Sequence, residues 1–529
     1  MSSNSSPAQD AAPQPKVNPW LIGIVVSLAA FMEVLDTSIA NVALPHIAGT
    51  LGASNDESTW VLTSYLVSNA VVLPISGFLV GWLGRKRFFL TCIVFFTLSS
   101  FLCGIAPSLG MLLLFRVLQG AFGGGLQPMT QAILADTFPP EKRGLAFALY
   151  GITIVCAPAI GPTFGGWITD NYSWRWIFYI NVPVGILAVL LVSQLIQDPP
   201  QLPRLKGAMA RFDYIGFSLL AVGVGALQVA LDKGQEDDWF GSRFITTLII
   251  VSVVGLVSLV IWEWRHKNPI VDVRLFKLFN FASCSVMMFV LGAVLFSSTV
   301  LLPQFLQTLM GYTAEKAGMV ISMAAIVLVF LLPMVGKLAG HVQARYILAF
   351  GWSTLAVAMY LSCKRIDLLM SFGSAAWMRI WQYMPVGFLF VPLTMAAYVG
   401  LPAEKSNAAA GLINFVRNIG QGFGTSAVTT LLARRSQYHQ SVLAEYTRSH
   451  RFQAVIQGTA LKLSYAGLSM HEAQRQALGR LYGMVQQQAA TLSYIDVYWL
   501  LSVIAAAMFL LSFLLRRNQP GASGEVQMH

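Results

Sequence analysis

The chain has 529 residues, of which 56% are hydrophobic and only 11% are charged, and its formal net charge is +11. Soluble domains carry about 25% charged residues, so this composition excludes an ordinary soluble protein and indicates a polytopic membrane protein. The positive charge does not indicate a nucleic-acid partner, because most basic residues lie in short segments between apolar runs.

Residues 1–19 are polar and lack the basic start and short apolar core of a cleavable signal peptide, so we expect a cytoplasmic N-terminal tail. The remaining sequence predicts fourteen membrane-spanning helices, which makes the fold class all-α. The expected spans are approximately 20–44, 59–80, 88–106, 110–134, 145–168, 176–196, 213–231, 244–263, 281–304, 315–336, 346–363, 376–400, 406–432 and 495–515.

An even number of spans places both termini on one side of the membrane. The loops and tails on that side contain eighteen of the 34 Lys and Arg residues, whereas the opposite short loops contain six. Basic residues favour the cytoplasmic side, so both termini, including a tail at 516–529, are expected in the cytoplasm.

The first span contains two acids, Glu33 and Asp36, on one helix face. A charge near the bilayer centre costs about 3 kcal/mol on insertion scales, so an ion or proton pathway is the default interpretation. Arg116 in the fourth span is expected at a similar depth, about 9 Å below the outer surface against about 12 Å for Asp36. The two charges therefore predict either a proton-loading pair or a static salt bridge.

Between the second and third spans, Gly77, Gly84, Arg85 and Lys86 form a cytoplasmic loop motif. The loop is interpreted either as a positive-inside anchor or as a conformational latch between helices. In the fifth span, prolines and glycines predict a bent, closely packed helix, with generic helix packing as the alternative. They are Pro158, Gly161, Pro162, Gly165 and Gly166.

Polar residues also occur in the ninth and thirteenth spans. Gln304 and Gln307 follow Pro303, and either line a substrate cavity or mark the end of that helix. Arg417 either faces a central cavity with Asn414 and Gln421 or satisfies backbone carbonyls at a helix break.

The segment 434–493 carries seven basic residues and two acids, is rich in Gln and Ala, and contains no Pro. We expect helices there rather than a flexible linker. At about 60 residues it is long enough to cross regardless of its charge, so it is assigned to the outer, periplasmic side. It is interpreted either as a cap over the outer mouth or as a docking surface for a protein.

The strings Ser38–Pro45 and Ser298–Pro303 suggest an internal repeat. Two six-helix halves, 20–196 and 281–515, would then flank a linker at 197–280 that contains two inserted spans. Parallel repeats of this kind build transporters that rock around a midplane site.

Several catalytic signatures are absent. The chain contains no phosphate-binding loop of the Walker type and no His-Glu-x-x-His pattern, and its five cysteines show no metal spacing. No metal or cofactor is expected, and the chain is not expected to be an enzyme.

Taken together, these motifs resemble the major facilitator superfamily, and more closely its fourteen-span drug:proton antiporters of the EmrB/QacA type. The resemblance rests on Leu35–Pro45 in the first span, Arg116–Gly120 in the fourth and Gly161–Gly166 in the fifth. Further stretches resemble the EmrB-type inner-membrane multidrug export subunits. They are Trp174–Gly185, Leu231–Gly234, Asn268–Asp272, Leu301–Gln304 and Asn414–Arg417.

The resemblance implies proton-driven export of lipophilic or amphipathic compounds, such as hydrophobic antibiotics, uncouplers, fatty acids and detergents. It places the chain in the bacterial inner membrane, in contact with lipid, as part of a tripartite pump with a periplasmic adaptor and an outer-membrane channel. It also implies that Asp36 is the protonation site, with Arg116 as its partner. A proton-coupled uptake transporter for a small polar solute is the alternative, and a non-transporting membrane receptor or scaffold is a third hypothesis.

The chain departs from the superfamily pattern at Gly81, where the cytoplasmic loop usually carries an Asp. A charge latch that uses this Asp cannot operate here. Glu33 is a further acid, which would raise the proton count, help to bind cations, or share one proton with Asp36.

Overall fold

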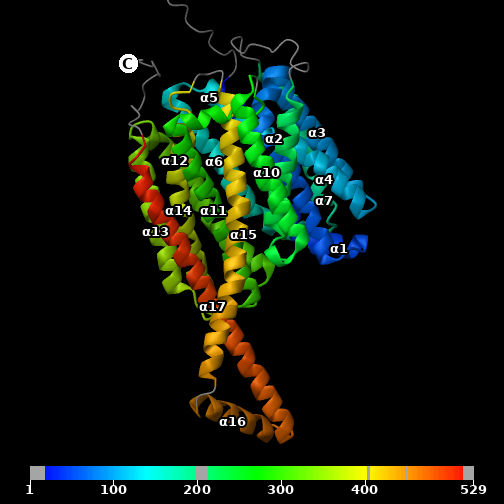
Figure 1. Cartoon of the computed structure of the whole chain (residues 1–529), viewed down its shortest axis with the longest axis vertical. Helices are drawn as coiled ribbons and strands as arrows, with labels where there is room; N and C mark the ends of the chain where they lie inside the picture. Colours follow the sequence, from blue (N-terminus) through cyan, green and yellow to red (C-terminus); the bar gives the residue numbers. More distant parts are fainter. Residues whose placement is uncertain (1–17, 198–211, 268, 402–404, 448–449, 516–529) are drawn as a thin grey trace, which may run out of the picture.

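The computed structural model describes residues 18–197, 212–267, 269–401, 405–447 and 450–515, and the regular elements in these ranges are all helices (Figure 1). The expected terminal tails, apart from residues 18 and 19, and residues 198–211 and 268 of the expected linker lie outside the described residues. The all-α fold class is therefore confirmed for the part of the chain that the structure describes.

The first eight helices form the N-terminal half of the bundle. They are α1 (Pro19–Leu51), α2 (Asn55–Leu83), α3 (Arg85–Ile105), α4 (Leu109–Gly123), α5 (Leu126–Thr137), α6 (Pro140–Asn171), α7 (Trp176–Tyr179) and α8 (Asn181–Leu195).

A hairpin of two long helices follows. Its elements are α9 (Tyr214–Lys233), the short 3-10 helix η2 (Trp239–Gly241), α10 (Arg243–Arg265) and the 3-10 helix η3 (Val273–Lys277).

The C-terminal half completes the bundle and carries an extension. Its helices are α11 (Phe279–Thr308), α12 (Ala314–Ala339), α13 (Ala344–Arg365), α14 (Phe372–Ala397), α15 (Ser406–Tyr446), α16 (His450–Tyr465) and α17 (Met470–Ser512).

Every one of the fourteen expected spans coincides with a described helix or with two consecutive helices. Among the described residues, thirteen stretches are long and apolar enough to cross a membrane, and the exception is 406–432 within α15. This stretch carries Asn414, Arg417 and Gln421, which lower its hydropathy, yet α15 packs along α11, α17 and α2 in the bundle. Its polar face points to neighbouring helices, so it does not need the composition of a lipid-facing span.

The fourth span is divided into α4 and α5 at Gly124 and Gly125. A side chain at either position would collide with a neighbour. A Cβ at 124 would lie 2.7 Å from the Asn69 carbonyl oxygen, and a Cβ at 125 would lie 2.6 Å from the Cys92 sulfur. The glycines thus let this span pass directly against α2 and α3, and the break redirects the residues of α5.

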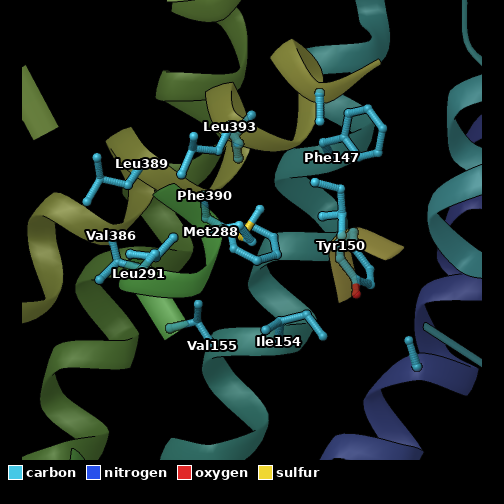
Figure 2. Close-up of a cluster of buried hydrophobic side chains, with 14 of the residues drawn as sticks. Phe147, Tyr150, Ile154, Val155, Met288, Leu291, Val386, Leu389, Phe390 and Leu393 are labelled. Atoms are coloured by element: carbon cyan, nitrogen blue, oxygen red, sulfur yellow. The ribbon is translucent and has the colours of Figure 1, made fainter. Parts of the chain in front are cut away.

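The two halves meet along α6 and α12 and along α2 and α15. Between the halves, Phe147, Tyr150, Ile154 and Val155 of α6 lie against an apolar group from α11 and α14 (Figure 2). This group comprises Met288, Leu291, Val386, Leu389, Phe390 and Leu393. Burying such side chains at native density fixes how α6 sits against the C-terminal half.

The inserted α9–α10 hairpin lies over the place where α2 meets α15. Trp239 donates from its indole nitrogen to Thr430 of α15 at 2.9 Å, and Lys233 donates to Thr59 of α2 at 2.5 Å. Thr63 of α2 also donates to Asp232. The hairpin is therefore bonded to both halves, while α10 presents an exposed apolar face, including Val253, that suits contact with lipid.

The expected helices in 434–493 are confirmed for its described residues. The end of α15, α16 and the start of α17 form a stalk that projects from the end of the bundle opposite to the C-terminal end of α17 (Figure 1). Inside it, Ala460 of α16 packs against Ala473 and Ala477 of α17. At its base, His439 and Arg435 of α15 contact the Asp496 carboxylate of α17 at 2.8 and 3.3 Å.

Candidate functional site

Asp36 and Arg116 form an ion pair deep inside the N-terminal half. The Arg116 Nη1 atom lies 2.6 Å from Asp36 Oδ2. The Arg116 side chain is 0% exposed to solvent, and the Asp36 side chain is 1% exposed. The helices bring these residues together because α1 and α4 both pack against α2. The two charges expected at matched depths are thus in direct contact.

Two amides hold the other oxygen of the Asp36 carboxylate. Gln119, one turn after Arg116 on α4, donates to Oδ1 at 2.9 Å, and Asn181 at the start of α8 donates to the same atom at 2.7 Å. Asn181 also donates to Ser100 of α3 at 3.0 Å. The carboxylate therefore accepts hydrogen bonds from α4 and α8, which is the arrangement that a buried charge needs.

The Arg116 guanidinium is enclosed as tightly as its partner. It donates from Nε to the Val61 carbonyl oxygen at 3.1 Å and lies over the Tyr65 ring, 4.3 Å from the centroid. Leu35, Ile39 and Phe178 add an apolar layer around the pair. Removing one partner of such a buried pair costs about 3–5 kcal/mol, because the other charge is left uncompensated.

Glu33 lies about one turn before Asp36 on α1 but belongs to a different set of contacts. Its carboxylate accepts from the Tyr65 hydroxyl and the Asn69 amide, both at 3.0 Å, and from the Gln127 amide at 2.5 Å. Glu33 is only 3% exposed. The two acids therefore have separate partners, apart from Tyr65, whose ring faces Arg116 while its hydroxyl bonds Glu33.

The Glu33 network continues into the C-terminal half. Gln127 of α5 accepts hydrogen bonds from the Arg417 guanidinium of α15 and, at 3.3 Å, from the Tyr150 hydroxyl. Asn414 of α15 donates to Gln131 of α5 at 2.8 Å. A chain of polar side chains thus connects a carboxylate on α1 to a guanidinium on α15, across the boundary between the halves.

The other polar residues singled out in the sequence are not part of this network. The Gln304 side-chain oxygen Oε1 is buried without a hydrogen-bond partner among the described residues, whereas Gln307 is exposed near the end of α11. Gln421 lies on α15 where it packs against Gly292 of α11. The structure therefore brings Asn414 and Arg417 together at the centre and leaves these three glutamines at separate places.

The Pro- and Gly-rich segment of α6 packs against α1 immediately after Asp36. The Ser38 hydroxyl donates to the Pro158 carbonyl oxygen at 3.3 Å. A Cβ at Gly161 would lie 2.3 Å from Ser38 Oγ, and one at Gly165 would lie 2.9 Å from Ile39 Cγ2. Pro162 stands between these contacts, and a Cβ at Gly166 would only touch Val42 at 3.9 Å. Gly161 and Gly165 therefore permit the close approach that sets the position of α1.

The cytoplasmic loop motif makes contacts at the end of the bundle opposite to the stalk. Arg85, at the start of α3, pairs with Asp136 of α5 at 2.6 Å and donates to Asn407 of α15 at 3.2 Å. Gly84, with a φ of 85°, makes the turn before it, and Lys86 donates to the Ser193 carbonyl oxygen at 2.5 Å. Gly77 lies against the Ala408 backbone, where a Cβ would be 2.8 Å from Cα. Although Gly81 supplies no acid, Arg85 still connects the two halves.

The sequence reasoning missed two charged residues that are 0% exposed in the described part of the chain, Arg379 of α14 and Glu263 of α10. It also missed the amides Gln119, Gln127 and Asn181, which hold the two acids. A signal was present, because Arg116 and Arg379 are both followed by Gln three residues later. This spacing puts each Gln beside its Arg on one helix face.

No group of three metal-ligating side chains occurs among the described residues. The five cysteines are free, and Cys92, Cys103, Cys156 and Cys284 are buried.

A model described as "Major Facilitator Superfamily" matches residues 26–425 of the chain. The chain belongs to this superfamily of membrane transporters. The match confirms the family that the sequence motifs predicted. The chain is therefore a multi-pass membrane protein.

Two relatives in the superfamily resemble nearly the whole chain. The "Multidrug export protein EmrB" of Escherichia coli (strain K12) is 38% identical over 480 residues, which cover 91% of this chain and 92% of that protein. The "Fatty acid resistance protein FarB" of Neisseria gonorrhoeae is 39% identical over 481 residues, which cover 90% of this chain and 92% of that protein.

Two solved structures support the major facilitator fold. The human organic anion transporter MFSD10 aligns with a TM-score of 0.59 at 12% identity, covering 94% of this chain and 100% of that chain. The proton:xylose symporter XylE aligns with a TM-score of 0.56 at 12% identity, covering 94% and 96%. At this identity the similarity supports the fold alone.

We predict that Gly161→Ala impairs transport and stability, because the added methyl group collides with Ser38 next to Asp36. Overpacking of this kind costs about 1–3 kcal/mol. The measurement is the thermal midpoint of the purified protein together with its transport rate. Gly166→Ala is the matched control, since its methyl group would meet only an ordinary contact at 3.9 Å. Equal effects of the two substitutions would contradict the proposal that the close packing of Gly161 against Ser38 sets the position of α1.

Proposed function

We propose that this protein is a proton-coupled antiporter that exports lipophilic or amphipathic compounds from the bacterial cytoplasm or inner leaflet. The observation that carries the proposal is the buried Asp36–Arg116 pair inside a bundle of the major facilitator superfamily. The export direction is supported by the relatives named for multidrug export and fatty acid resistance.

Asp36 can act as the proton-binding group because its contacts respond to charge. The ionised carboxylate attracts the Arg116 guanidinium, and protonation removes that attraction. Arg116 then retains the Gln119 side-chain oxygen Oε1 at 2.9 Å and the Val61 backbone carbonyl oxygen as acceptors. In the proposed cycle, proton loss from Asp36 accompanies substrate binding from the inside, and protonation from the outside accompanies release.

Glu33 supplies a second response to protonation, at the boundary between the halves. Its ionised carboxylate accepts three hydrogen bonds, and through Gln127 it is connected to Arg417. Protonation would replace one accepted hydrogen bond by a donor and weaken the electrostatic attraction toward Arg417. We therefore propose that Glu33 couples proton binding to separation of α5 from α15.

The driving force is sufficient for export. One charge that crosses 100 mV releases about 2.3 kcal/mol, which corresponds to about a 50-fold concentration ratio.

We further propose that the protein works in the inner membrane with a periplasmic adaptor and an outer-membrane channel, with both termini in the cytoplasm. The stalk is the surface proposed for the adaptor. A groove of about 450 Å³ lies between its helices, lined by Gln440, Ile456, Leu478 and Tyr482 among others. Several apolar side chains on the stalk, including Tyr465 and Met484, are exposed and suit a protein contact.

One prediction from the proposed function concerns proton coupling. In inside-out vesicles with an acidic lumen, addition of a transported compound is expected to raise the lumenal pH, and Asp36→Asn is expected to abolish this response. Uptake of the labelled compound is measured in parallel, because lipophilic weak acids carry protons by themselves. Asp170→Asn is the control, since this surface acid is well exposed. Full proton-driven uptake by Asp36→Asn would overturn the proposal.

A second prediction concerns the link between Glu33 and Arg417. Glu33→Gln and Arg417→Gln should each slow transport, and the double variant should be no slower than the worse single variant. Residues that act through one network give such non-additive effects, with coupling energies of about 0.5–3 kcal/mol. Independent, additive losses would show that the two residues do not act together.

A third prediction concerns the stalk. Gln440 donates to the Tyr482 hydroxyl at 3.3 Å, so a short Gly-Ser linker can join 441 to 481 in place of the outer stalk. This variant is expected to keep substrate-dependent proton movement in vesicles and to lose co-purification with a periplasmic adaptor. Retained co-purification would place the adaptor contact elsewhere.

A further inference from the structure

Arg379, like Arg116, is 0% exposed, but it forms no ion pair among the described residues. Its Nη1 atom donates to the Ser298 carbonyl oxygen at 3.0 Å and to Gln382 at 3.1 Å, and its Nη2 atom donates to Thr299 at 2.7 Å. The guanidinium lies 4.0 Å above the centre of the Tyr383 ring. Its hydrogen bonds therefore go to neutral groups.

The surroundings of Arg379 reproduce those of Arg116. Each arginine lies seven residues after the first residue of its helix, Leu109 or Phe372. Both helices start at the stalk end of the bundle, so the two charges lie at the same depth, about 10 Å in. Each arginine also bonds to a Gln three residues later, and Gln382 in turn donates to Ser362 of α13 at 2.9 Å.

The two arrangements differ in one chemical group. In the N-terminal half, the first helix supplies the Asp36 carboxylate, whereas in the C-terminal half α11 supplies the hydroxyls of Ser298 and Thr299. The Arg379 Nε atom and the hydroxyl of Tyr498, which lies near it on α17, are buried without a hydrogen-bond partner among the described residues. Among the described residues, the Arg379 guanidinium in the C-terminal half therefore has no carboxylate partner within ion-pair distance.

Arg379 lies close to the boundary between the halves. Val386 and Phe390 follow it by seven and eleven residues, so all three share one face of α14. Thr299 follows Met288 by eleven residues and shares a face of α11 with it. Figure 2 shows Phe390 and Met288 next to Tyr150 of α6, and Val386 beside Leu291 of α11. Thr299, which accepts a hydrogen bond from Arg379, is only partly buried. One side chain therefore separates the Arg379 guanidinium from an accessible surface.

A fixed charge at this place acts on a substrate without direct contact. At about 10 Å and an effective dielectric constant near 20, a unit positive charge changes the affinity for an anion by on the order of tenfold. It disfavours a cation by a similar factor.

We propose that Arg379 selects amphipathic substrates that carry an anionic headgroup, of which a fatty carboxylate is the simplest case. The inference rests on the proposed export function and adds the charge of the substrate to it. The charges of Asp36 and Arg116 cancel each other. Of these two buried clusters, only the one around Arg379 therefore has a net charge that acts at the boundary between the halves.

The test uses two probes with the same alkyl chain, dodecanoate and dodecyltrimethylammonium. Ser298→Asp places a carboxylate beside Arg379 without removing it, because the Ser298 hydroxyl lies 3.2 Å from Nη1. Ser298→Asn is the uncharged control. Arg379→Gln removes the charge, and Arg379→Lys conserves it. Uptake into vesicles and equilibrium binding to the detergent-purified protein are both measured.

Ser298→Asp and Arg379→Gln are expected to lower dodecanoate uptake and binding about tenfold relative to dodecyltrimethylammonium, whereas Ser298→Asn and Arg379→Lys keep the wild-type ratio. An equal loss for both probes, or an unchanged ratio in Ser298→Asp, would overturn the inference and identify Arg379 as structural. Failure of the export proposal has a different signature, in which wild-type vesicles take up neither probe. The binding ratio of Ser298→Asp still decides the inference in that case.

Discussion

The ion pair between Asp36 and Arg116 is the contact on which the N-terminal half depends. Leaving either charge buried without the other would cost about 3–5 kcal/mol, so the packing of α1 and α4 places them within hydrogen-bond distance. Gln119 and Asn181 then complete the carboxylate's contacts and bring in α8. Because one carboxylate on α1 accepts hydrogen bonds from α4 and α8, a proton on it would change the contacts between several helices. This sensitivity makes the pair suitable for coupling as well as for structure.

Close helix packing supports that geometry. Gly161 and Gly165 let α6 approach α1 beside Asp36, while Gly124 and Gly125 let the fourth span pass against α2 and α3. The glycines therefore serve the polar site even though they carry no functional group. At the boundary between the halves, apolar packing of α6 against α11 and α14 lies beside the hydrogen bonds between α5 and α15. Protonation of Glu33 would therefore change only a few hydrogen bonds at this boundary and leave the apolar contacts in place.

Much of the fold was predictable from hydropathy, because lipid requires long apolar segments. Asp36 and Arg116 were predictable for the converse reason, since charges in such segments are costly. The partners of Glu33 were not, because Gln127, Tyr65 and Asn69 are uncharged and come together only through tertiary packing. The division of the fourth span depends on contacts with Asn69 and Cys92 that a local sequence does not reveal. Arg379 was detectable through its spacing to Gln382, but its lack of an acid could be seen only in the structure.

The α9–α10 hairpin has a consequence for the shape of the protein in the plane of the membrane. It lies over the line where α2 meets α15 and is bonded to Thr59 on one side and Thr430 on the other. The corresponding line between α6 and α12 has no such cover among the described helices. A twelve-helix transporter built from two repeats presents two similar flanks to lipid, whereas this protein presents two unlike ones. A hydrophobic molecule that diffuses within a leaflet therefore meets a different surface depending on the direction of its approach.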